Sequence, residues 1–290
     1  MGEAVDADSR VAKITSEVRL PEGLDAESDY HLRSFTFPVT SKDGEIFQCG
    51  YFDIDPAQVQ KNPGAEYPFN DTRLRQLFAK FVEAGAKAFQ NYNSEGVQAY
   101  VVNKLNKPGR KSFAIAMDKE WNIASFQIYQ AADLKGEFEG VKVLYLDQMG
   151  TQLDFGGRGI GSGVASEVFN HLSPDVLCTS SANAEMHGLA RSVGRSHELV
   201  EYPTGEERVP GKILKLAQDI NLQFELTTAT LDDRLVRTYA GPVSKGRFQD
   251  KEGLIGKIGL ADTQHIFYMA VRPELAPSVT PPRIERGSNP

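Results

Sequence analysis

The sequence predicts an α/β protein of the α+β type, in which helices flank a sheet. Three features support this class. Two pairs of alternating stretches, rich in aromatic and β-branched residues, are separated by short turns that are typical of antiparallel hairpins. Amphipathic helical patterns lie between the two pairs. After the second pair, an apolar stretch leads into a glycine-rich turn and then into another amphipathic helix.

The first hairpin is expected near the amino terminus. Residues 30–39 and 45–54 alternate between apolar and polar side chains, and they flank Ser41-Lys42-Asp43-Gly44. The dipeptide Asp43-Gly44 is a turn signal. Residues 1–27 are polar, acidic and aperiodic, so we expect a flexible arm before the hairpin.

Two helices and a second hairpin should follow. Asn70-Asp71 is a good cap for a helix whose apolar stripe consists of Leu74, Leu77, Phe78, Phe81, Val82 and Phe89. A second helix is predicted over 96–105, closed by Lys107-Pro108-Gly109. Residues 112–117 and 123–129 then make the second hairpin, and its partner should be the strand that begins at Val141.

The stretch 141–172 carries the clearest chemistry. Residues 141–149 are predicted to form a strand, 155–163 a glycine-rich turn, and the residues from Val164 to Leu172 a helix with apolar side chains at a three-and-four spacing. Glycines let main-chain N–H groups converge, and a helix N-terminus adds partial positive charge. The turn is therefore predicted to hold a phosphate.

Two familiar nucleotide-binding loops fit the spacing of these glycines poorly. The phosphate loop of nucleoside triphosphatases needs Gly-Lys-Ser/Thr, and this turn contains no lysine. The dinucleotide fingerprint needs glycine at its first, third and sixth positions, whereas these glycines recur at every second residue from Gly157 to Gly163.

Residues 149–162, Met-Gly-Thr-Gln-Leu-Asp-Phe-Gly-Gly-Arg-Gly-Ile-Gly-Ser, instead resemble the signature of the GCN5-related N-acetyltransferase (GNAT) superfamily. The predicted order of helices, hairpin, long strand, glycine turn, helix, strand and helix also matches that family. The resemblance implies a mixed, mostly antiparallel sheet and acetyl-CoA or another acyl-CoA as substrate. The residues it implies for acyl-CoA binding are Met149, Thr151, Gly157, Arg158, Gly159, Ile160, Gly161, Ser162 and Asn183.

A second segment, 183–194, resembles the part of the family in which an asparagine opens a helix that ends in Leu-Tyr-x-x-x-Gly-Phe. The matching positions are Asn183, Leu189 and Gly194. Asn183 is also a good helix N-cap and Gly194 a good residue to follow a helix, so local structure alone explains both. Three family positions differ, because the leading Arg/Gln of the loop is Gly156, the tyrosine is Ala190 and the phenylalanine is Arg195.

Two functional classes stay open. The first is an acyl-CoA-dependent N- or O-acyltransferase, most simply an acetyltransferase, that acts on a small-molecule acceptor. The second is a relative that kept the fold and performs another reaction, for example a decarboxylation or cyclisation in small-molecule biosynthesis, or has a binding role. The intact stretch 157–162 favours the first class, whereas Gly156 and Ala190 favour the second.

If acyl transfer occurs, another group should replace the missing tyrosine. The candidates, in order, are His187, Tyr145 and Asp147. His187 is the only imidazole in the helix that borders the thioester in the family, and imidazole titrates near neutral pH. Tyr145 could donate a proton, and Asp147, two residues further along the strand, could accept one from an amine. A solvent-facing histidine and a structural aspartate are the plain alternatives.

The domain predicted from 28–202 is followed by an added segment, 203–274, that should pack on the same sheet. It contains a predicted helix at 212–218, a half-buried strand in which Ile220, Leu222, Phe224 and Leu226 alternate, and a central strand at 264–271 that is apolar on both faces. This segment could be a lid, a half-domain or the contact of a homodimer. The proline-rich residues 275–290 are predicted to be a disordered tail.

Composition limits the remaining possibilities. The net charge of −7, with no evident basic patch, argues against a nucleic-acid partner. No apolar run approaches the length of a membrane span. With only Cys49 and Cys178 present, a disulfide framework is not indicated, so a reducing, cytoplasmic location is expected. No metal site is predicted.

Overall fold

The computed structural model describes residues 34–54, 72–88, 93–105, 111–205, 208–226, 231–238, 258, 260 and 264–277. The predicted arm at 1–27 and most of the predicted tail lie outside these residues.

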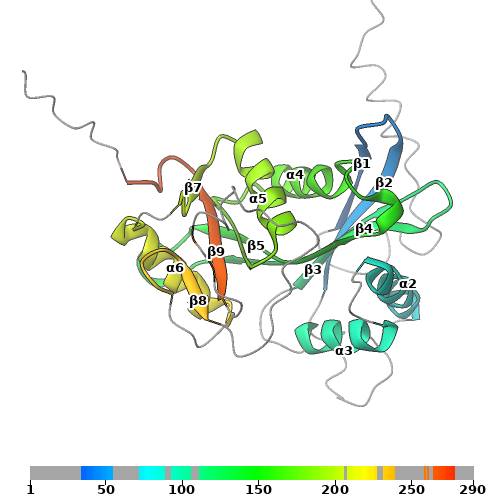
Figure 1. The fold of residues 1–290 in the computed structure, drawn as a ribbon, viewed down its shortest axis with the longest axis horizontal. Helices are drawn as coiled ribbons and strands as arrows, with labels where there is room; N and C mark the ends of the chain where they lie inside the picture. The colour runs from blue at the N-terminus through cyan, green and yellow to red at the C-terminus, as the bar shows by residue number, and fades with distance from the viewer. Residues whose placement is uncertain are drawn as a thin grey trace, which may run out of the picture.

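From residue 34 to residue 196 the described strands and helices follow one another in the predicted order (Figure 1). The strands are β1 (Ser34–Thr40), β2 (Ile46–Ile54), β3 (Lys111–Met117), β4 (Ile123–Asp133), β5 (Lys142–Thr151), β6 (Val176–Ser181), β7 (Val200–Tyr202), β8 (Val236–Thr238) and β9 (Gln264–Val271). The helices are α2 (Thr72–Ala88), α3 (Ser94–Leu105), α4 (Ile160–Leu172), α5 (Ala184–Ser196) and α6 (Gly211–Gln223), with short 3₁₀ turns η2 (Gly136–Phe138) and η3 (Leu153–Phe155).

The strands of the described residues form one sheet in the order β1-β2-β3-β4-β5-β6-β9-β7, and β8 pairs with β9. The pair β5–β6 is parallel, whereas the other described pairs are antiparallel. A parallel pair needs a crossover connection, which α4 supplies. The predicted mixed, mostly antiparallel sheet flanked by helices is therefore confirmed.

The two predicted hairpins are present as β1–β2 and β3–β4. In the first, Gly44 has a φ of 87°, which explains the glycine of the turn signal. The predicted stripe of α2 is buried at Leu77, Phe78, Phe81 and Val82, while the side chain of Leu74 and all of Phe89 lie outside the described residues.

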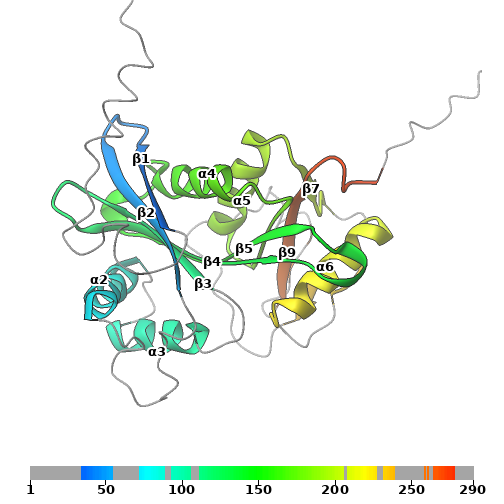
Figure 2. The ribbon, with the colours of Figure 1, turned by 180° about the vertical axis from the view of Figure 1, so that it is seen from behind.

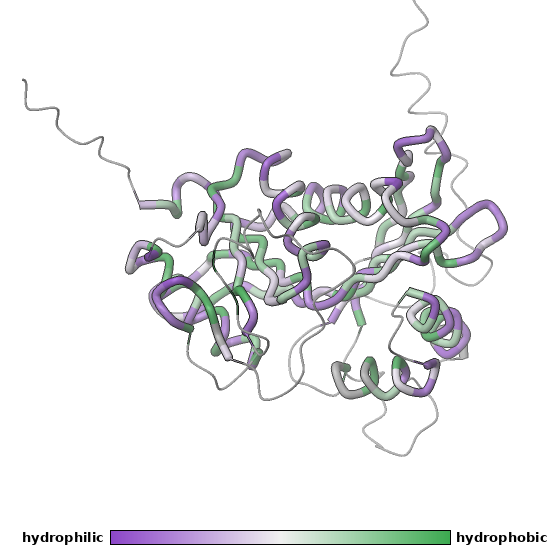
Figure 3. Tube along the Cα trace, in the orientation of Figure 1, coloured by the Kyte–Doolittle hydropathy of each residue, from purple (hydrophilic) through white to green (hydrophobic). Residues whose placement is uncertain are grey.

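Helices cover both faces of the sheet (Figures 1 and 2). Helices α4 and α5 pack together on one face, where they share a core with residues from β1 to β6. Helices α2 and α3 cover β2 to β4 on the opposite face, and α6 covers β5, β6 and β9 on that same side. Hydrophobic residues gather along the strands and polar residues at the exposed turns (Figure 3).

Strand β9 completes the sheet between β6 and β7. Its side chains alternate between two cores, with Phe267, Met269 and Val271 on the α6 side and Ile266, Tyr268 and Ala270 on the α5 side. The predicted central strand over 264–271 is confirmed. Strands β7 and β9 are neighbours in the sheet, but α6 and β8 lie between them along the chain.

The prediction of a strand at residues 220–226 is wrong. Helix α6 extends to Gln223, five residues beyond the predicted end at 218. Its buried side chains Ile213, Leu216, Ala217 and Ile220 recur at helical spacing, so Ile220 ends a helical stripe. Leu222 is 75% exposed, which a half-buried strand would not allow at that position.

Candidate functional site

The two central strands diverge in the middle of the sheet. Strands β5 and β6 are paired from Val143 opposite Val176 to Leu146 opposite Thr179. Beyond this point β5 continues along β4, whereas Ser180 and Ser181 of β6 pair with β9. The described ladders therefore leave a wedge-shaped divergence between the carboxyl ends of β5 and β6.

A β-bulge marks the start of this divergence. Leu146 lies opposite Tyr129 of β4 and Gln148 lies opposite Ile128, so Asp147 is the extra residue on β5. A bulge bends its strand and increases the local twist. It thus helps to turn the end of β5 away from β6.

Strand β5 leads through η3 into the predicted glycine turn. Gly157 and Gly159 have φ angles of 76° and 81°, a region that strains residues with a Cβ. Helix α4 starts at Ile160, and its first described hydrogen bond joins the Gly163 N–H to the Gly159 oxygen at 2.9 Å. The N–H groups from 159 to 162 precede the helical ladder and are of the kind that binds anions.

The predicted binding residues of β5 and the turn meet at Gly161. A Cβ built on Gly161 would lie 3.6 Å from Met149 Cε, 3.6 Å from Thr151 Oγ1 and 3.4 Å from Leu189 Cδ1. The end of β5, the start of α4 and the middle of α5 are therefore in contact. Asn183, in contrast, caps α5, because its side-chain oxygen accepts a hydrogen bond from the Glu185 N–H at 2.8 Å. Its role in acyl-CoA binding stays a prediction.

Arg158 connects the glycine turn to the β1–β2 turn. Its guanidinium pairs with Asp43 at 2.8 Å and Glu45 at 2.5 Å, and it packs over the rings of Phe47 and Phe155. The hydrogen bonds to Asp43 and Glu45 raise the pKa of Arg158 above its usual value. The side chain of Arg158 thus joins the glycine turn to the β1–β2 turn. Only the main-chain N–H of Arg158 is left for the predicted binding of acyl-CoA.

Two buried polar side chains of β4 form hydrogen bonds that hold the start of α4. The Gln127 amide donates a hydrogen bond from Nε2 to the Gly161 oxygen at 2.5 Å, and the Tyr129 hydroxyl donates to Gln127 Oε1. Both side chains are fully buried in β4. Burial and the neighbouring Tyr51 raise the pKa of Tyr129 well above its usual value, so the phenol keeps its proton.

The structure does not bring the three candidate acids and bases together. His187 is buried on the α5 side, and its Nε2 lies 2.8 Å from the Ser181 oxygen. Because a carbonyl oxygen only accepts, Nε2 is the protonated nitrogen. Tyr145 is buried on the opposite face against Phe224 and Phe267. Asp147, only 5% exposed, occupies the bulge at the divergence.

Ala190, where the family carries a tyrosine, is fully buried in one cluster with Tyr268 of β9. The Tyr268 hydroxyl is buried without a hydrogen-bond partner among the described residues, and burial raises its pKa. It lies 3.2 Å from the position of a Cβ on Gly194, near the last turn of α5. Its ring lies 6.2 Å from the ring of His187, which is in the first turn of the same helix.

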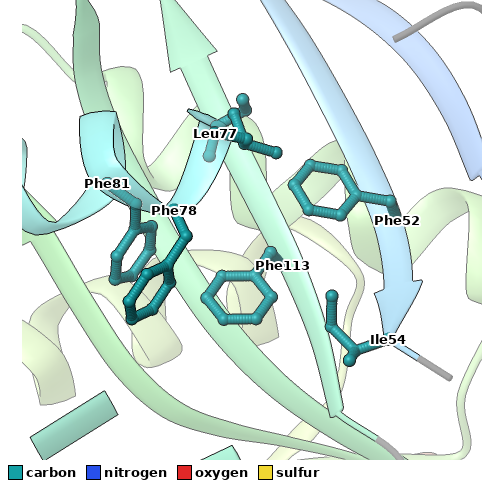
Figure 4. A pocket seen from close by; sticks show the side chains of 7 residues that line it. Phe52, Ile54, Leu77, Phe78, Phe81 and Phe113 are labelled. Atoms are coloured by element: carbon teal, nitrogen blue, oxygen red, sulfur yellow. The ribbon is translucent and has the colours of Figure 1, made fainter. Parts of the chain in front are cut away.

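A separate apolar pocket lies between α2 and strands β2 and β3 (Figure 4). Its lining consists of Phe52, Ile54, Leu77, Phe78, Phe81, Phe113 and Ile115. None of these residues belongs to the predicted site. Among the described residues, no cluster of three or more His, Cys, Asp or Glu side chains is arranged to hold a metal, and no helix is long and apolar enough to cross a bilayer.

Sequence reasoning identified the glycine turn but missed its neighbours. Lys42 and Gln127, which contact the turn, belong to a hairpin turn and a strand that precede it in the chain. The charged sequence of the β1–β2 turn was the one available signal for Lys42. Nothing in the pattern of β4 indicated that the amide of Gln127 supports α4.

Comparison with solved structures returns acetyltransferases. An acetyltransferase from Corynebacterium glutamicum, described with histone acetyltransferase HPA2, is 18% identical, over 47% of this chain and 84% of that chain, with a TM-score of 0.34. Tetrahymena GCN5 is 11% identical, over 53% and 82%, with a TM-score of 0.33. Ribosomal-protein-alanine N-acetyltransferase from Brucella melitensis is 19% identical, over 36% and 71%, with a TM-score of 0.28.

No protein-family model and no curated protein sequence matches the chain. The TM-scores of these structural likenesses are too low to carry an argument. The element order, the parallel β5–β6 pair and the glycine turn at the start of α4 are features of the chain itself. They are the fold features that the sequence's resemblance to the GCN5-related N-acetyltransferases predicted.

Proposed function

We propose that the protein is an acyl-CoA-dependent acyltransferase, with acetyl-CoA as the donor and the amine or hydroxyl of a small molecule as the acceptor. The observation that carries this proposal is the divergence of β5 and β6 immediately before a glycine turn that opens α4. It places the carboxyl end of β5, beyond its last pairing with β6, close to a helix start of the kind that binds anions. A ligand with a diphosphate at one end and an amide-containing arm fits that combination.

The chain offers suitable groups for both parts of acyl-CoA. The N–H groups of 157–162 would bind the diphosphate, because those from 159 to 162 precede the helical ladder and a Cβ on Gly157 would meet nothing within 4 Å. The edge of β5 at 149–151 would hydrogen-bond the pantetheine arm as a neighbouring strand would.

The reaction would be a direct transfer. The acceptor nitrogen or oxygen attacks the thioester carbonyl, a tetrahedral intermediate forms, and its collapse breaks the carbon–sulfur bond and releases the thiolate of coenzyme A. A thiol has a pKa of about 8.5, so the thiolate leaves without a dedicated proton donor more readily than an alkoxide would. The absence of a tyrosine at Ala190 is therefore compatible with transfer.

We rank Asp147 first as the base that takes the proton of the acceptor. It is the first residue of β5 beyond the last β5–β6 pair. His187 ranks second, because its Nε2 already donates to Ser181 and only Nδ1 could accept a proton. Tyr145 ranks third, since it packs on the α6 side of the sheet.

Calorimetric titration with acetyl-CoA, followed by turnover assays on a panel of amines and alcohols, tests the proposal. We expect binding and acyl transfer, and we expect Asp147→Asn to lower turnover by about a hundredfold with little change in acetyl-CoA affinity. Absence of acetyl-CoA binding at millimolar concentration would refute the proposal. Full turnover in Asp147→Asn would move the base to His187.

The second candidate is a relative that binds acyl-CoA or a similar ligand without transferring an acyl group. The fully buried Ala190, which leaves that position of α5 without a hydroxyl, favours it. Binding of acetyl-CoA with no transfer to any acceptor would support this candidate. We also propose a cytoplasmic location, from the reduced cysteines expected there; the oligomeric state can be measured on the same sample.

A further inference from the structure

We propose that the ammonium group of Lys42, in the β1–β2 turn, binds the diphosphate of acyl-CoA at the glycine turn. This inference rests on the proposed function and adds to it a residue from outside the glycine turn. Lys42 would supply the cation that the turn itself does not offer.

The β1–β2 turn is fixed against the glycine turn by main-chain hydrogen bonds. The Ser41 N–H donates to the Glu45 oxygen at 2.8 Å and the Gly44 N–H to the Ser41 oxygen at 2.9 Å, which closes the hairpin turn. The Lys42 N–H donates to the Arg158 oxygen at 2.9 Å. The backbone of Lys42 is therefore held at Arg158, two residues before α4 starts at Ile160.

The side chain of Lys42 lies along Gly159. A Cβ built on Gly159 would be 3.4 Å from Lys42 Cγ, 3.8 Å from Cδ and 3.4 Å from Cε. Because the nitrogen is one bond beyond Cε, it lies within about 5 Å of the same point. The ammonium group thus reaches the beginning of α4, where the N–H groups precede the helical ladder.

The charges around the turn explain why this cation matters. Arg158 is paired with both Asp43 and Glu45, so one guanidinium faces two carboxylates and the group carries a net charge of about −1. Such a group opposes the approach of a diphosphate. Gly156 offers no cation either. Among the described residues Lys42 makes no ion pair, and its charge offsets the excess carboxylate.

The test uses Lys42→Met, which keeps a flexible apolar stem over Gly159 and removes the charge. Lys119→Met is the matched control, because Lys119 is an exposed lysine in the β3–β4 turn with a side chain 79% accessible. Affinities for coenzyme A, dephospho-coenzyme A and acetyl-pantetheine are measured by calorimetry. Thermal unfolding of each variant reports on the fold.

We expect Lys42→Met to weaken coenzyme A and dephospho-coenzyme A by about tenfold, the effect of one charge-assisted hydrogen bond, and to leave acetyl-pantetheine unchanged. Lys119→Met should match wild type with every ligand. Lys42→Arg should restore most of the affinity. The difference between Lys42→Met and wild type should shrink at about 0.5 M salt, since exposed charges are screened.

Three results would overturn the inference. Equal affinity of Lys42→Met and wild type for coenzyme A removes Lys42 from the site and leaves the proposed function standing. An effect on coenzyme A but not on dephospho-coenzyme A assigns Lys42 to the 3′-phosphate instead of the diphosphate. Failure of the wild-type protein to bind coenzyme A at all overturns the proposed function and this inference with it.

Discussion

The two halves of the sheet are built in different ways. The N-terminal half, β1 to β5, is a run of antiparallel neighbours in chain order. The C-terminal half, β6, β9, β7 and β8, is assembled out of order, with the last strand of the described chain lying between β6 and β7. The two halves meet in the short parallel pairing of β5 with β6.

This difference explains where the candidate site lies. Antiparallel neighbours that follow one another can stay paired along their length, whereas a parallel pair joined by a helix need only pair where the crossover brings it together. Beyond Leu146 and Thr179 each strand follows its own half of the sheet. The divergence is therefore a seam between two halves, closed on one face by α4 and α5.

The largest effect is expected from Phe267→Ala in β9. Phe267 is fully buried on the α6 side, so truncation leaves a cavity that should cost about 3–5 kcal/mol of unfolding free energy. Because the core under α4 and α5 spans both halves, we expect one cooperative transition at lower denaturant concentration. Two separate transitions in chemical denaturation would show that the halves unfold independently.

Gly150→Ala should be the next most damaging change, and it acts on the N-terminal half. A Cβ there would lie 2.4 Å from Phe126 Cζ and 2.6 Å from Cε1, and that ring is held against Phe81. We expect a loss of about 1–3 kcal/mol from overpacking. Gly188→Ala is the control, since a Cβ on this helical glycine meets nothing within 4 Å. It should stabilise α5 by roughly 0.5–1 kcal/mol. Equal effects of the two changes in denaturant titrations would contradict the described packing.

The same comparison shows what the sequence could predict. The N-terminal half follows from local signals, such as Asp43-Gly44 in the first hairpin turn. In the C-terminal half, the two-sided apolar pattern of 264–271 correctly predicted a central strand, but local pattern could not say that it enters beside β6. Residues 220–226 were misread because apolar residues two apart fit the end of a helix as well as a strand.

The candidate site also contains features that the local sequence predicts and features that it does not. The glycine turn is contiguous, and its positive φ angles at Gly157 and Gly159 suit the residues that sequence reasoning selected. The contact of Arg158 with Glu45 joins residues 113 positions apart, which no local pattern encodes. The sequence also could not predict the direction of each side chain along β5. Regular alternation of side chains would hold along the whole strand, but the bulge at Asp147 interrupts it.

Gln127→Met should weaken coenzyme A binding by about fivefold to tenfold. The substitution removes the donor that holds the Gly161 carbonyl, and with it one net hydrogen bond that orients the start of α4. Gln130→Met is the matched control, because Gln130 is also buried in β4 and its Oε1 has no hydrogen-bond partner among the described residues. If calorimetry finds the same loss of coenzyme A affinity in both variants, the loss comes from a disturbed fold of β4 and not from the missing hydrogen bond to Gly161.

The smallest expected signal is the reactivity of the two cysteines in the native protein. Cys49 lies in the N-terminal half and Cys178 in the C-terminal half, and burial raises the pKa of both thiols. We expect negligible labelling by a thiol reagent near pH 8, and simultaneous labelling once the protein unfolds. Prior labelling of Cys178 would indicate that the C-terminal half opens first.

Hydrogen exchange with and without acetyl-CoA tests the central claim most directly, because it reports both binding and its location. If acetyl-CoA lies in the seam, amides at 147–151 and 157–162 should become protected, while those of β1 and β3 stay unchanged. Gly159→Val, which forces a branched side chain into a φ of 81° beside Lys42, should abolish the protection. Protection confined to other residues, or none at millimolar acetyl-CoA, would contradict the account.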